Sequence, residues 1–333
     1  MKESSFSDKL SWHIICIVMV FSVIAQMVTA FVITDGSMNP LEWWHDSTEL
    51  MISLTVIGVV SFVLIYIATR GAIKRMTRNE EKLKATKEAA ERLESDLALA
   101  RELQMEMLRT DFPPNLFAML KPAKEVGGDL YDFDLKGDRL FFAIGDVSGK
   151  GLPASLVMAI TSATLHLVEE SELPLDMMLH HINDSFCARS RSGMFVTLFI
   201  ACLDLSTGHM DYCNAGHSPL LVIPDDGEPY FLKCKPNIAI GMLKDFAYDA
   251  ESIDFKRGTR IVAYTDGVTE AERKDLSQFG NDRLLAWAKQ TPTTSDEAPL
   301  DECSVVENLC GAVAGFAEGH PQNDDITIMS IRV

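Results

Sequence analysis

The sequence has few basic residues for its length. Its 333 residues contain 30 Lys and Arg against 48 Asp and Glu, which gives a formal net charge of -18 at pH 7. Proteins that bind nucleic acid use Lys and Arg to neutralise phosphates and to release counterions. The composition therefore argues against nucleic acid as a partner, whereas the acidic excess favours the binding of cations.

Paired cysteines are also absent. The seven Cys form no C-x-x-C pair, are odd in number and lie mostly in apolar runs. This pattern is typical of reduced cysteines in a hydrophobic core. Because disulfides persist in oxidising compartments, we expect the bulk of the chain to lie in a reducing one.

Several catalytic signatures are missing. No Cys is followed six residues later by the Arg that a cysteine phosphatase needs. Residues 145–151 are one residue shorter than a P-loop and end on Gly instead of Ser or Thr. No His lies between His45 and His166, where a histidine kinase would need its phosphoacceptor. Leu130 stands where the diguanylate cyclase signature has a second acidic residue.

Charged residues are missing from two long stretches near the N-terminus. Residues 14–33 are almost wholly apolar, and residues 50–69 form a second uncharged run. About 20 helical residues span the ~30 Å core of a bilayer. We therefore predict two transmembrane helices, 14–33 and 50–69, joined by a short external loop at 34–49. A cleaved signal peptide would explain only the first run, which exceeds the usual apolar region of about 7 to 15 residues.

The distribution of basic residues predicts the orientation of these spans. The loop 34–49 contains no Lys or Arg, whereas four basic residues follow the second span within nine positions, namely Arg70, Lys74, Arg75 and Arg78. Cytoplasmic flanks carry the excess of Lys and Arg. We therefore expect a protein of the inner (cytoplasmic) membrane, in contact with the lipid bilayer, whose N-terminal segment 1–13 and C-terminus are both cytoplasmic.

Glycine and proline are absent from residues 79–109, where Glu, Lys, Ala, Leu and Arg predominate. Such a composition favours a long helix. Two series of residues recur every seven positions: Leu83, Ala90, Leu97 and Gln104, and Thr86, Leu93, Ala100 and Met107. The repeat predicts a parallel coiled coil and a homodimer through residues 79–109, within a helical linker at 70–112. A solvated helix lying on the following domain is the alternative.

Residues 113–333 have the pattern of one globular domain. Strands are predicted for segments rich in Val, Ile, Phe and Tyr, and helices for longer segments, two of which begin with proline. The predicted strands are 139–147, 194–205, 209–214, 220–223, 259–266 and 325–333, and the predicted helices are 153–170, 174–190, 282–290 and 303–318. Strands in meander pairs and helices in groups predict an α+β layered sandwich.

Acidic residues recur at the predicted strand ends and tight turns. They are Asp129, Asp146, Asp266 and the pair Asp324 and Asp325. Each alone is an ordinary turn residue. If the strands bring them together, however, two carboxylates about 4 Å apart repel by roughly 4 kcal/mol at an effective dielectric constant of 20. Such a cluster needs cations or protons, and an all-oxygen ligand set favours Mg²⁺ or Mn²⁺.

Five motifs, four of which contain these residues, occur in a specific order. They are Val126-Gly-Gly-Asp-Leu-Tyr-Asp132, Gly145-Asp-Val-Ser-Gly-Lys-Gly-Leu-Pro-Ala154, Asn214-Ala-Gly-His-Ser-Pro219, Thr265-Asp-Gly-Val-Thr-Glu270 and Asp324-Asp-Ile-Thr327. In this order they resemble the metal-dependent type-2C (PPM) serine/threonine phosphatases, and most of all the bacterial SpoIIE/RsbU branch. The resemblance covers roughly residues 100–333. It implies a PPM-type α-β-β-α sandwich, two Mn²⁺ or Mg²⁺ ions, and hydrolysis of phosphoserine or phosphothreonine without a phosphoenzyme.

The resemblance also implies roles for individual residues. Asp146 would bridge the two ions, the backbone carbonyl of Val147 would add a ligand, and Asp129, Asp266 and Asp324 would complete the ligand set. These four Asp are the predicted catalytic residues.

Further residues of the motifs have supporting roles by the same resemblance. Asp325 is an additional candidate ligand, although many relatives outside this branch have Asn at its place. Many of those relatives bind phosphate with an Arg that has no clear equivalent here, which leaves Lys124 and Lys150 as candidates. Four glycines would let the backbone approach the site, namely Gly127, Gly128, Gly149 and Gly151. Asn214 and His217 are interpreted as a structural turn.

The sequence thus predicts a membrane-tethered phosphatase that acts on a cytoplasmic phosphoprotein. By the resemblance, the substrate would be an anti-sigma-factor antagonist of the STAS type. The alternative is a catalytically silent signalling module of the same fold that binds a partner. The presence of all four carboxylates argues against that alternative.

Overall fold

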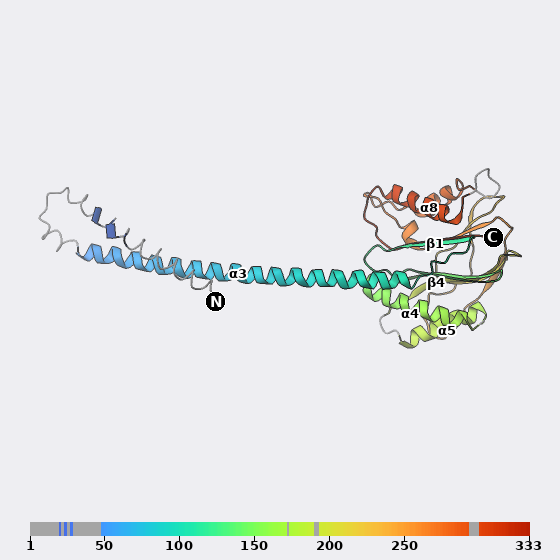
Figure 1. The fold of residues 1–333 in the computed structure, drawn as a ribbon, viewed down its shortest axis with the longest axis horizontal. Helices are drawn as coiled ribbons and strands as arrows, with labels where there is room; N and C mark the ends of the chain where they lie inside the picture. Colours follow the sequence, from blue (N-terminus) through green and yellow to red (C-terminus); the bar gives the residue numbers. More distant parts are fainter. Residues whose placement is uncertain are drawn as a thin grey trace. The chain divides into compact units, whose positions relative to one another are not determined.

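The computed structural model describes residues 20, 23–24, 27–28, 48–171, 173–189, 193–292 and 300–333 (Figure 1). Most of the first predicted span, 14–33, and of the loop 34–49 therefore lies outside the described residues. The chain divides into two units, Met1–Arg92 and Leu93–Val333.

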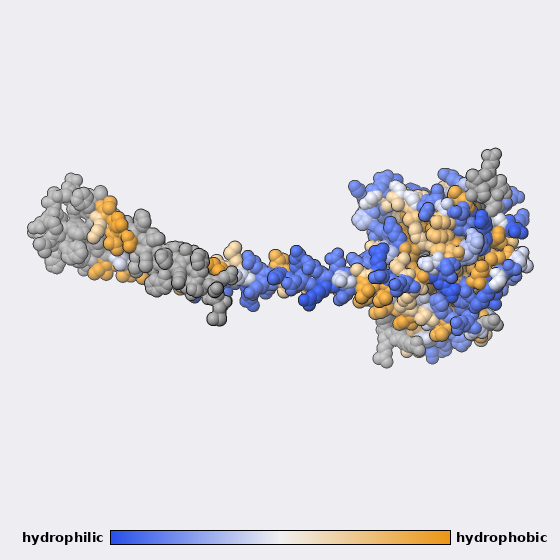
Figure 2. Space-filling model, viewed as in Figure 1, coloured by the Kyte–Doolittle hydropathy of each residue, from blue (hydrophilic) through white to orange (hydrophobic). Residues whose placement is uncertain are grey.

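Helix α3 runs without interruption from Thr48 to Glu106, a length of 59 residues. The second predicted span and most of the predicted linker are therefore parts of one helix. Figure 2 shows apolar side chains along the N-terminal part of α3 and mainly polar ones towards its C-terminal part. Ile57 and Leu64 are each more than 60% exposed in the apolar part. Such exposure is what a membrane-facing helix requires and what a soluble helix avoids.

Two helical stretches of the described residues are long and apolar enough to cross a membrane, Thr55–Glu106 and Leu152–Glu169. The second is a helix of the globular unit and has buried residues. Because a core helix of a soluble domain meets the same criterion, length and composition alone are weak evidence for a span. The membrane hairpin and the coiled coil therefore stay predictions.

The second unit contains two five-stranded antiparallel sheets. The first has the order β1-β10-β9-β6-β7, with β1 Leu116–Lys121, β10 Ile326–Arg332, β9 Arg260–Tyr264, β6 Leu221–Ile223 and β7 Tyr230–Phe231. The second has the order β2-β3-β4-β5-β8, with β2 Leu130–Lys136, β3 Arg139–Val147, β4 Val196–Asp204, β5 His209–Ala215 and β8 Glu251–Asp254.

Helices cover the outer faces of the two sheets (Figure 1). Helix α8, Glu302–Ala317, packs on β1 and β10 of the first sheet, while α4, Leu152–Glu169, and α5, Leu175–Arg189, pack on the second. The remaining helices of this unit are α6, Asp266–Thr269, and α7, Gly280–Ala288. The predicted α-β-β-α sandwich is confirmed.

The core explains why the two sheets stack. Strand β3 is apolar almost throughout, and Leu140, Phe142 and Ile144 are fully buried. These residues belong to a large cluster that includes strands of both sheets, as the presence of Ile261 and Met329 shows. Burying each such side chain contributes about 1.5 to 3 kcal/mol.

Strands β1, β2, β7 and β8 and the short helix α6 were not predicted. Strand β2, Leu-Tyr-Asp-Phe-Asp-Leu-Lys, is interrupted by Asp132 and Asp134, which hides its apolar pattern. The fold accommodates Asp132, which is only 2% exposed, because Arg109 and His166 lie beside it. A tertiary ion pair thus turns an unfavourable strand sequence into a buried strand.

Candidate active site

The acidic residues converge at one edge of the sandwich. Asp129 immediately precedes β2, and Asp146 is the second-last residue of β3, where it pairs with Thr197 of β4. Asp266 is the first residue of α6, just after β9, so the predicted strand ends earlier than expected. Asp324 lies just before β10. Each sheet therefore contributes two of the four carboxylates.

Asp129 connects the two sheets. Its Oδ2 atom accepts hydrogen bonds from Thr265 Oγ1 at 2.8 Å and from Thr327 Oγ1 at 2.6 Å, and both threonines belong to the β9–β10 side. Thr327 N in turn donates to Thr265 Oγ1 at 3.0 Å. Asp129 is 1% exposed. Sequence reasoning missed the two threonines, although both lie within the motifs.

Burial and mutual repulsion raise the pKa of Asp129. Desolvation is the main cause, the negative charge of Asp146 adds to it, and the two threonine hydrogen bonds act in the opposite direction. The result is a pKa well above the usual range for Asp129. A buried carboxylate with a raised pKa and a charged neighbour is typical of a functional site.

Asp146 lies at the centre of the cluster. Burial raises its pKa to about 7, and the charges of Asp266, Asp324 and Asp325 add to the effect. A side-chain hydrogen bond with Asp129 acts in the opposite direction. The four predicted carboxylates are thus close enough to interact.

Asp266 has the same kind of environment. Burial raises its pKa first, then the charges of Glu270 and Asp324, while Lys150 lowers it. Glu270 was not among the predicted site residues. Its place at the end of the motif that contains Asp266 is the signal that could have identified it.

Lys150 forms an ion pair with the cluster. Its Nζ atom lies 2.7 Å from Asp324 Oδ2 and donates a hydrogen bond to the Asn323 carbonyl at 2.6 Å. Asp324 raises the pKa of Lys150, and burial of the ammonium acts against this. Lys124 is exposed in the loop between β1 and β2. Of the two candidate phosphate-binding lysines, Lys150 is the one placed beside the carboxylates.

Asp325 differs from the other carboxylates in its hydrogen bonds. Its Oδ1 atom accepts from Ala123 N and its Oδ2 atom from Gly128 N, both at 2.7 Å. It is 7% exposed. These bonds fasten the turn before β2 to the start of β10, which favours a structural role over ligation for Asp325.

The predicted glycines permit close approach of the backbone. A Cβ atom on Gly127 would collide with the Asp325 carboxylate, and one on Gly128 would lie 3.0 Å from the Val147 carbonyl oxygen. Gly149 and Gly151 have positive φ angles of 97° and 73°, which side-chain-bearing residues rarely adopt. The Val147 carbonyl is therefore held against the turn that carries Asp129.

Gln104, near the end of α3, contacts this same turn. Its Nε2 atom donates to the Gly127 carbonyl at 2.7 Å, and its Oε1 atom accepts from Gly127 N at 3.1 Å. The seven-residue repeat predicts Gln104 in a coiled-coil seam. In the structure, however, Gln104 is 6% exposed and its side-chain amide binds the globular domain. The alternative to the coiled coil, a helix that lies on the following domain, predicts a contact of this kind. The contact involves only the last turns of α3.

The Asn214-Ala-Gly-His motif forms a turn, as predicted. Asn214 Oδ1 accepts from His217 N at 2.7 Å, and Asn214 Nδ2 donates to the His217 carbonyl at 3.0 Å. His217 Nδ1 lies 3.0 Å from Thr197 Oγ1. Burial lowers the pKa of His217 to about 4, and the Tyr264 backbone offsets only part of this effect. His217 is thus a neutral structural residue at pH 7.

The donor chemistry of the cluster fits hard divalent cations. Its oxygens come from four carboxylates and a backbone carbonyl, and the raised pKa values of three carboxyls report negative charge that a cation would stabilise. Within the described part of the chain, no group of three or more His, Cys, Asp or Glu side chains has the geometry of a metal site. Asp324 Oδ2 is paired with Lys150 in this arrangement, so Lys150 would compete with a cation for that oxygen.

Comparisons with known proteins identify the family of the C-terminal part of the chain. Residues 136–333 match the family described as Stage II sporulation protein E (SpoIIE). Protein IcfG of Synechocystis sp. is 28% identical over 307 residues, covering 83% of this chain and 46% of IcfG. The phosphoserine phosphatase RsbU of Bacillus subtilis is 28% identical over 210 residues, covering 60% of this chain and 62% of RsbU. The chain thus spans less than two thirds of either relative.

A solved structure shows the same fold. The SiaA-PP2C domain of Pseudomonas aeruginosa superposes with a TM-score of 0.64 at 22% identity, covering 74% of this chain and 98% of that one. The PP2C phosphatase domain of SpoIIE from Bacillus subtilis, with a fragment of its regulatory domain, gives a TM-score of 0.56 at 20% identity, covering 66% of this chain and 63% of that one. The globular part of the chain therefore has the PP2C-type fold.

Proposed function

The chain belongs to the SpoIIE family, and we propose that it is a membrane-tethered, metal-dependent protein phosphatase that hydrolyses phosphoserine or phosphothreonine on a cytoplasmic signalling protein. One observation carries this proposal: Asp129, Asp146, Asp266 and Asp324 come from both sheets and meet at one edge of the sandwich. Four carboxylates held close together repel one another and destabilise the fold. A domain that only bound a partner protein would have no use for such a cluster.

Two Mg²⁺ or Mn²⁺ ions are the cofactors that this donor set suits. Asp146 would contribute to both, with Asp129, Asp266, Asp324 and the Val147 carbonyl as further ligands. When bound, such ions activate a water molecule for in-line attack on phosphorus and stabilise the charge of the transition state. The chain itself contributes the positions: Thr265 and Thr327 fix the Asp129 carboxylate by two hydrogen bonds.

Lys150 is the better placed candidate for binding the substrate phosphate. Its ammonium lies at the cluster and is 43% exposed, so it can exchange the Asp324 carboxylate for a phosphate oxygen. Release of Asp324 and capture of phosphate would then be coupled. Lys124 remains the second candidate.

The substrate class follows from the relatives. RsbU and RsbP of Bacillus subtilis are both described as phosphoserine phosphatases, which supports phosphoserine as the substrate group. An anti-sigma-factor antagonist of the STAS type is the substrate that we propose on the strength of the resemblance to this branch. The alternative, a catalytically silent module, is disfavoured by the completeness of the carboxylate set.

The direct test is metal-dependent hydrolysis. The purified 333-residue chain in detergent should hydrolyse p-nitrophenyl phosphate and a phosphoserine peptide when Mn²⁺ is present. Removal of divalent cations with a chelator should abolish turnover, and added Mn²⁺ should restore it. Turnover that is unaffected by the chelator, or no turnover with any divalent cation, would contradict the proposal.

The membrane topology makes a separate prediction. We propose that residues 14–33 and 50–69 span the inner membrane and that residues 79–109 form a parallel homodimer. A reporter fused after Asn39 should then be active outside the cytoplasm, and one fused after Asn79 inside it. The basic residues after the second span provide the physical reason. Cytoplasmic activity of both fusions would exclude the hairpin.

A further inference from the structure

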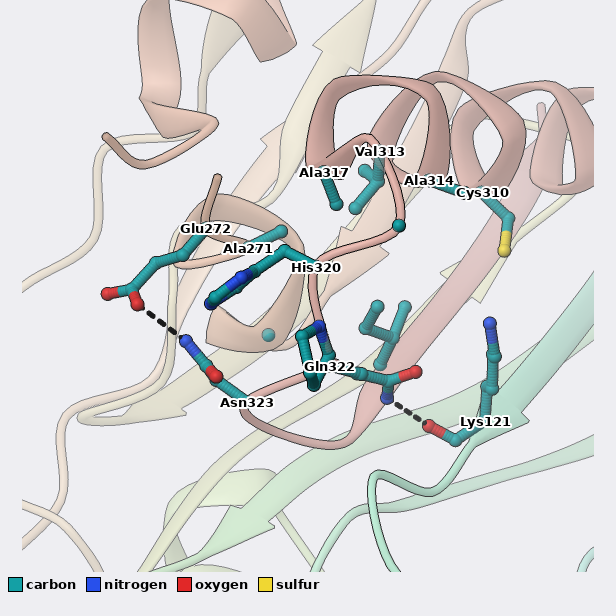
Figure 3. A pocket seen from close by; sticks show the side chains of 14 residues that line it. Lys121, Ala271, Glu272, Cys310, Val313, Ala314, Ala317, His320, Gln322 and Asn323 are labelled. Carbon is teal, nitrogen blue, oxygen red and sulfur yellow. Dashed lines mark hydrogen bonds between the residues drawn. The ribbon is translucent and has the colours of Figure 1, made fainter. Parts of the chain in front are cut away.

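A cavity of about 240 Å³ lies beside the carboxylate cluster (Figure 3). The C-terminal half of α8 forms one wall, residues 319–323 form another, and α6 with the residues that follow it forms the third. In Figure 3, Val313, Ala314 and Ala317 of α8 face the loop that carries His320, Gln322 and Asn323. The roles proposed above for the motif residues do not involve this cavity.

The inside of the cavity is apolar. Val313 and Ile326, which line it, are buried, with 2% and 5% exposure. Ala271, Ala314 and Ala317 are small, which leaves the space open. Polar groups are at its edge, where Glu272 Oε2 accepts a hydrogen bond from Asn323 Nδ2 at 2.7 Å. An apolar interior with a polar edge is the usual composition of a pocket that binds an apolar group.

The cavity and the proposed catalytic cluster are built from adjacent residues of the same two segments. Two of its residues, Gly267 and Asn323, are the chain neighbours of Asp266 and Asp324. Lys150 also connects the two places, because its Nζ atom binds both the Asn323 carbonyl and the Asp324 carboxylate. Neighbouring Cα atoms are 3.8 Å apart, so the backbone that lines the cavity at Gly267 and Asn323 is one residue from the backbone of Asp266 and Asp324.

Two hydrogen bonds of Gln322 fix the loop 319–323 at the polar edge of the cavity. Gln322 Nε2 donates to the Asp324 carbonyl and to the Lys121 carbonyl, both at 2.8 Å. The loop that separates the cavity from the cluster is therefore fastened to β1. A fixed edge maintains the spacing between a bound phosphate and a bound side chain, which specificity requires.

The size of the cavity indicates what can fill it. A dry cavity of about 150 Å³ binds a benzene molecule, so 240 Å³ holds a leucine, methionine or phenylalanine side chain. Sites for whole ligands usually measure about 300 to 1,000 Å³, which is larger. The volume thus suits one side chain of a protein better than a free cofactor.

We propose that this cavity is a specificity pocket for the phosphoprotein substrate, and that it binds one large apolar side chain within three residues of the phosphorylated Ser or Thr. The proposal rests on the phosphatase function proposed above. An extended peptide advances about 3.3 Å per residue and alternates its side chains. With the phosphate at the carboxylate cluster, a neighbouring side chain therefore reaches the cavity, while the peptide backbone crosses the polar edge near His320.

The test uses nine-residue phosphoserine peptides in which Leu or Ala occupies each of the three positions on either side of the phosphoserine. The purified chain in detergent with Mn²⁺ should show, at one position, a kcat/KM for the Leu peptide at least about tenfold higher than for the Ala peptide. A hydrophobic pocket discriminates by this order of magnitude. Hydrolysis of p-nitrophenyl phosphate by the same preparation tests the phosphatase function itself.

Filling the cavity should remove the preference. Ala314→Leu on α8, and Ala271→Leu on the opposite wall, should each lower the Leu-to-Ala ratio to below about threefold. The matched control is Gly315→Leu, since Gly315 is exposed on the same helix, has nothing within 4 Å of a built Cβ atom and does not line the cavity. It should keep the ratio of the unmodified chain. Because the readout is a ratio, a general loss of activity does not affect it.

Two results would overturn the proposal while the phosphatase function stands. One is p-nitrophenyl phosphate hydrolysis with a ratio near one at every peptide position. The other is a ratio that both filling variants leave unchanged, as expected if the cavity binds a free small molecule. If the chain hydrolyses neither p-nitrophenyl phosphate nor any peptide, the proposed function fails and the specificity pocket fails with it.

Discussion

Asp146→Asn should reduce metal-dependent phosphatase turnover by more than about 100-fold, since even residues that only support a metal ligand typically contribute 10- to 100-fold. The reason is its position: Asp146 interacts with all the other carboxylates of the cluster. Asparagine has nearly the same shape but cannot supply the negative charge that a shared cation needs. The measurement is kcat/KM for p-nitrophenyl phosphate across a Mn²⁺ titration.

The same substitution should raise the thermal unfolding temperature when divalent cations are chelated. Removing one of several mutually repelling, buried carboxylates relieves repulsion in the folded state. The increase in unfolding temperature on adding Mn²⁺ should shrink, because less cation binds to the folded state. This combination separates loss of a ligand from simple misfolding.

Asp138→Asn is the matched control for Asp146→Asn. Asp138 is exposed in the turn between β2 and β3, at the far end of the strand that carries Asp146. Its substitution should leave both turnover and the Mn²⁺ response unchanged. Full activity of Asp146→Asn, or an equal loss in Asp138→Asn, would contradict the assignment of the cluster.

Arg260→Met should lower the free energy of unfolding of the globular domain by about 3 kcal/mol. Arg260 and Glu302 are each 2% exposed, and Arg260 Nε lies 3.1 Å from Glu302 Oε2. Removing one partner of a buried pair typically costs about 3 to 5 kcal/mol, because the other charge stays buried without compensation. We expect the lower end, since Arg332 Nε lies 3.6 Å from Glu302 Oε1 and offsets part of the charge.

Two further variants test this explanation in urea unfolding experiments. The double substitution of Arg260→Met with Glu302→Leu should recover part of the lost stability, because Glu302 no longer stays buried without its partner, while the Pro292 and Leu300 carbonyls still lack the Arg260 donor. Lys289→Met removes one partner of the exposed Lys289–Glu228 pair, which measures 2.7 Å at 56% and 79% exposure, and should cost less than about 1 kcal/mol. Equal costs for the exposed and the buried pair would show that burial does not matter here.

The buried Arg260–Glu302 pair stabilises two elements, β9 and α8, that also position the candidate active site and the cavity. Arg260 stands at the start of β9, the strand that leads to Asp266, and its guanidinium binds the Pro292 and Leu300 carbonyls at 2.9 Å. The pair with Glu302 anchors the beginning of α8 to this strand. The wall of the cavity and one of the carboxylates are thus supported by the same buried ion pair.

Local patterns were sufficient for much of the fold. The apolar run before Asp146 predicted β3, and the turn before His209 predicted the β4–β5 meander. Local sequence patterns failed for segments whose burial depends on a residue far away in the sequence. Strand β2 contains Asp132, whose burial is helped by the distant residues Arg109 and His166 and by the backbone amide of Phe133. No local propensity carries that information.

The candidate site, like the fold, was predicted from the sequence only in part. Asp129, Asp146, Asp266 and Asp324 were identified from their places next to glycines and strand ends, and the structure brings them together. Their hydrogen-bond partners were not identified. Thr265 and Thr327 lie 136 and 198 residues from Asp129 in the chain, and a contact over such a separation follows only from how the two sheets stack.

The sequence by itself indicated the kind of chemistry, because the carboxylates in four of the five ordered motifs suit divalent cations and the order of the motifs resembles that of metal-dependent phosphatases. It also determined that two uncharged runs precede the catalytic domain. Only the tertiary structure decided the roles of neighbours in the chain: Asp325 binds two backbone amides, whereas Asp324 faces Lys150. The physical reason is that charge and ligand type belong to the residue, while burial, hydrogen-bond partners and cavities belong to the packing of distant segments.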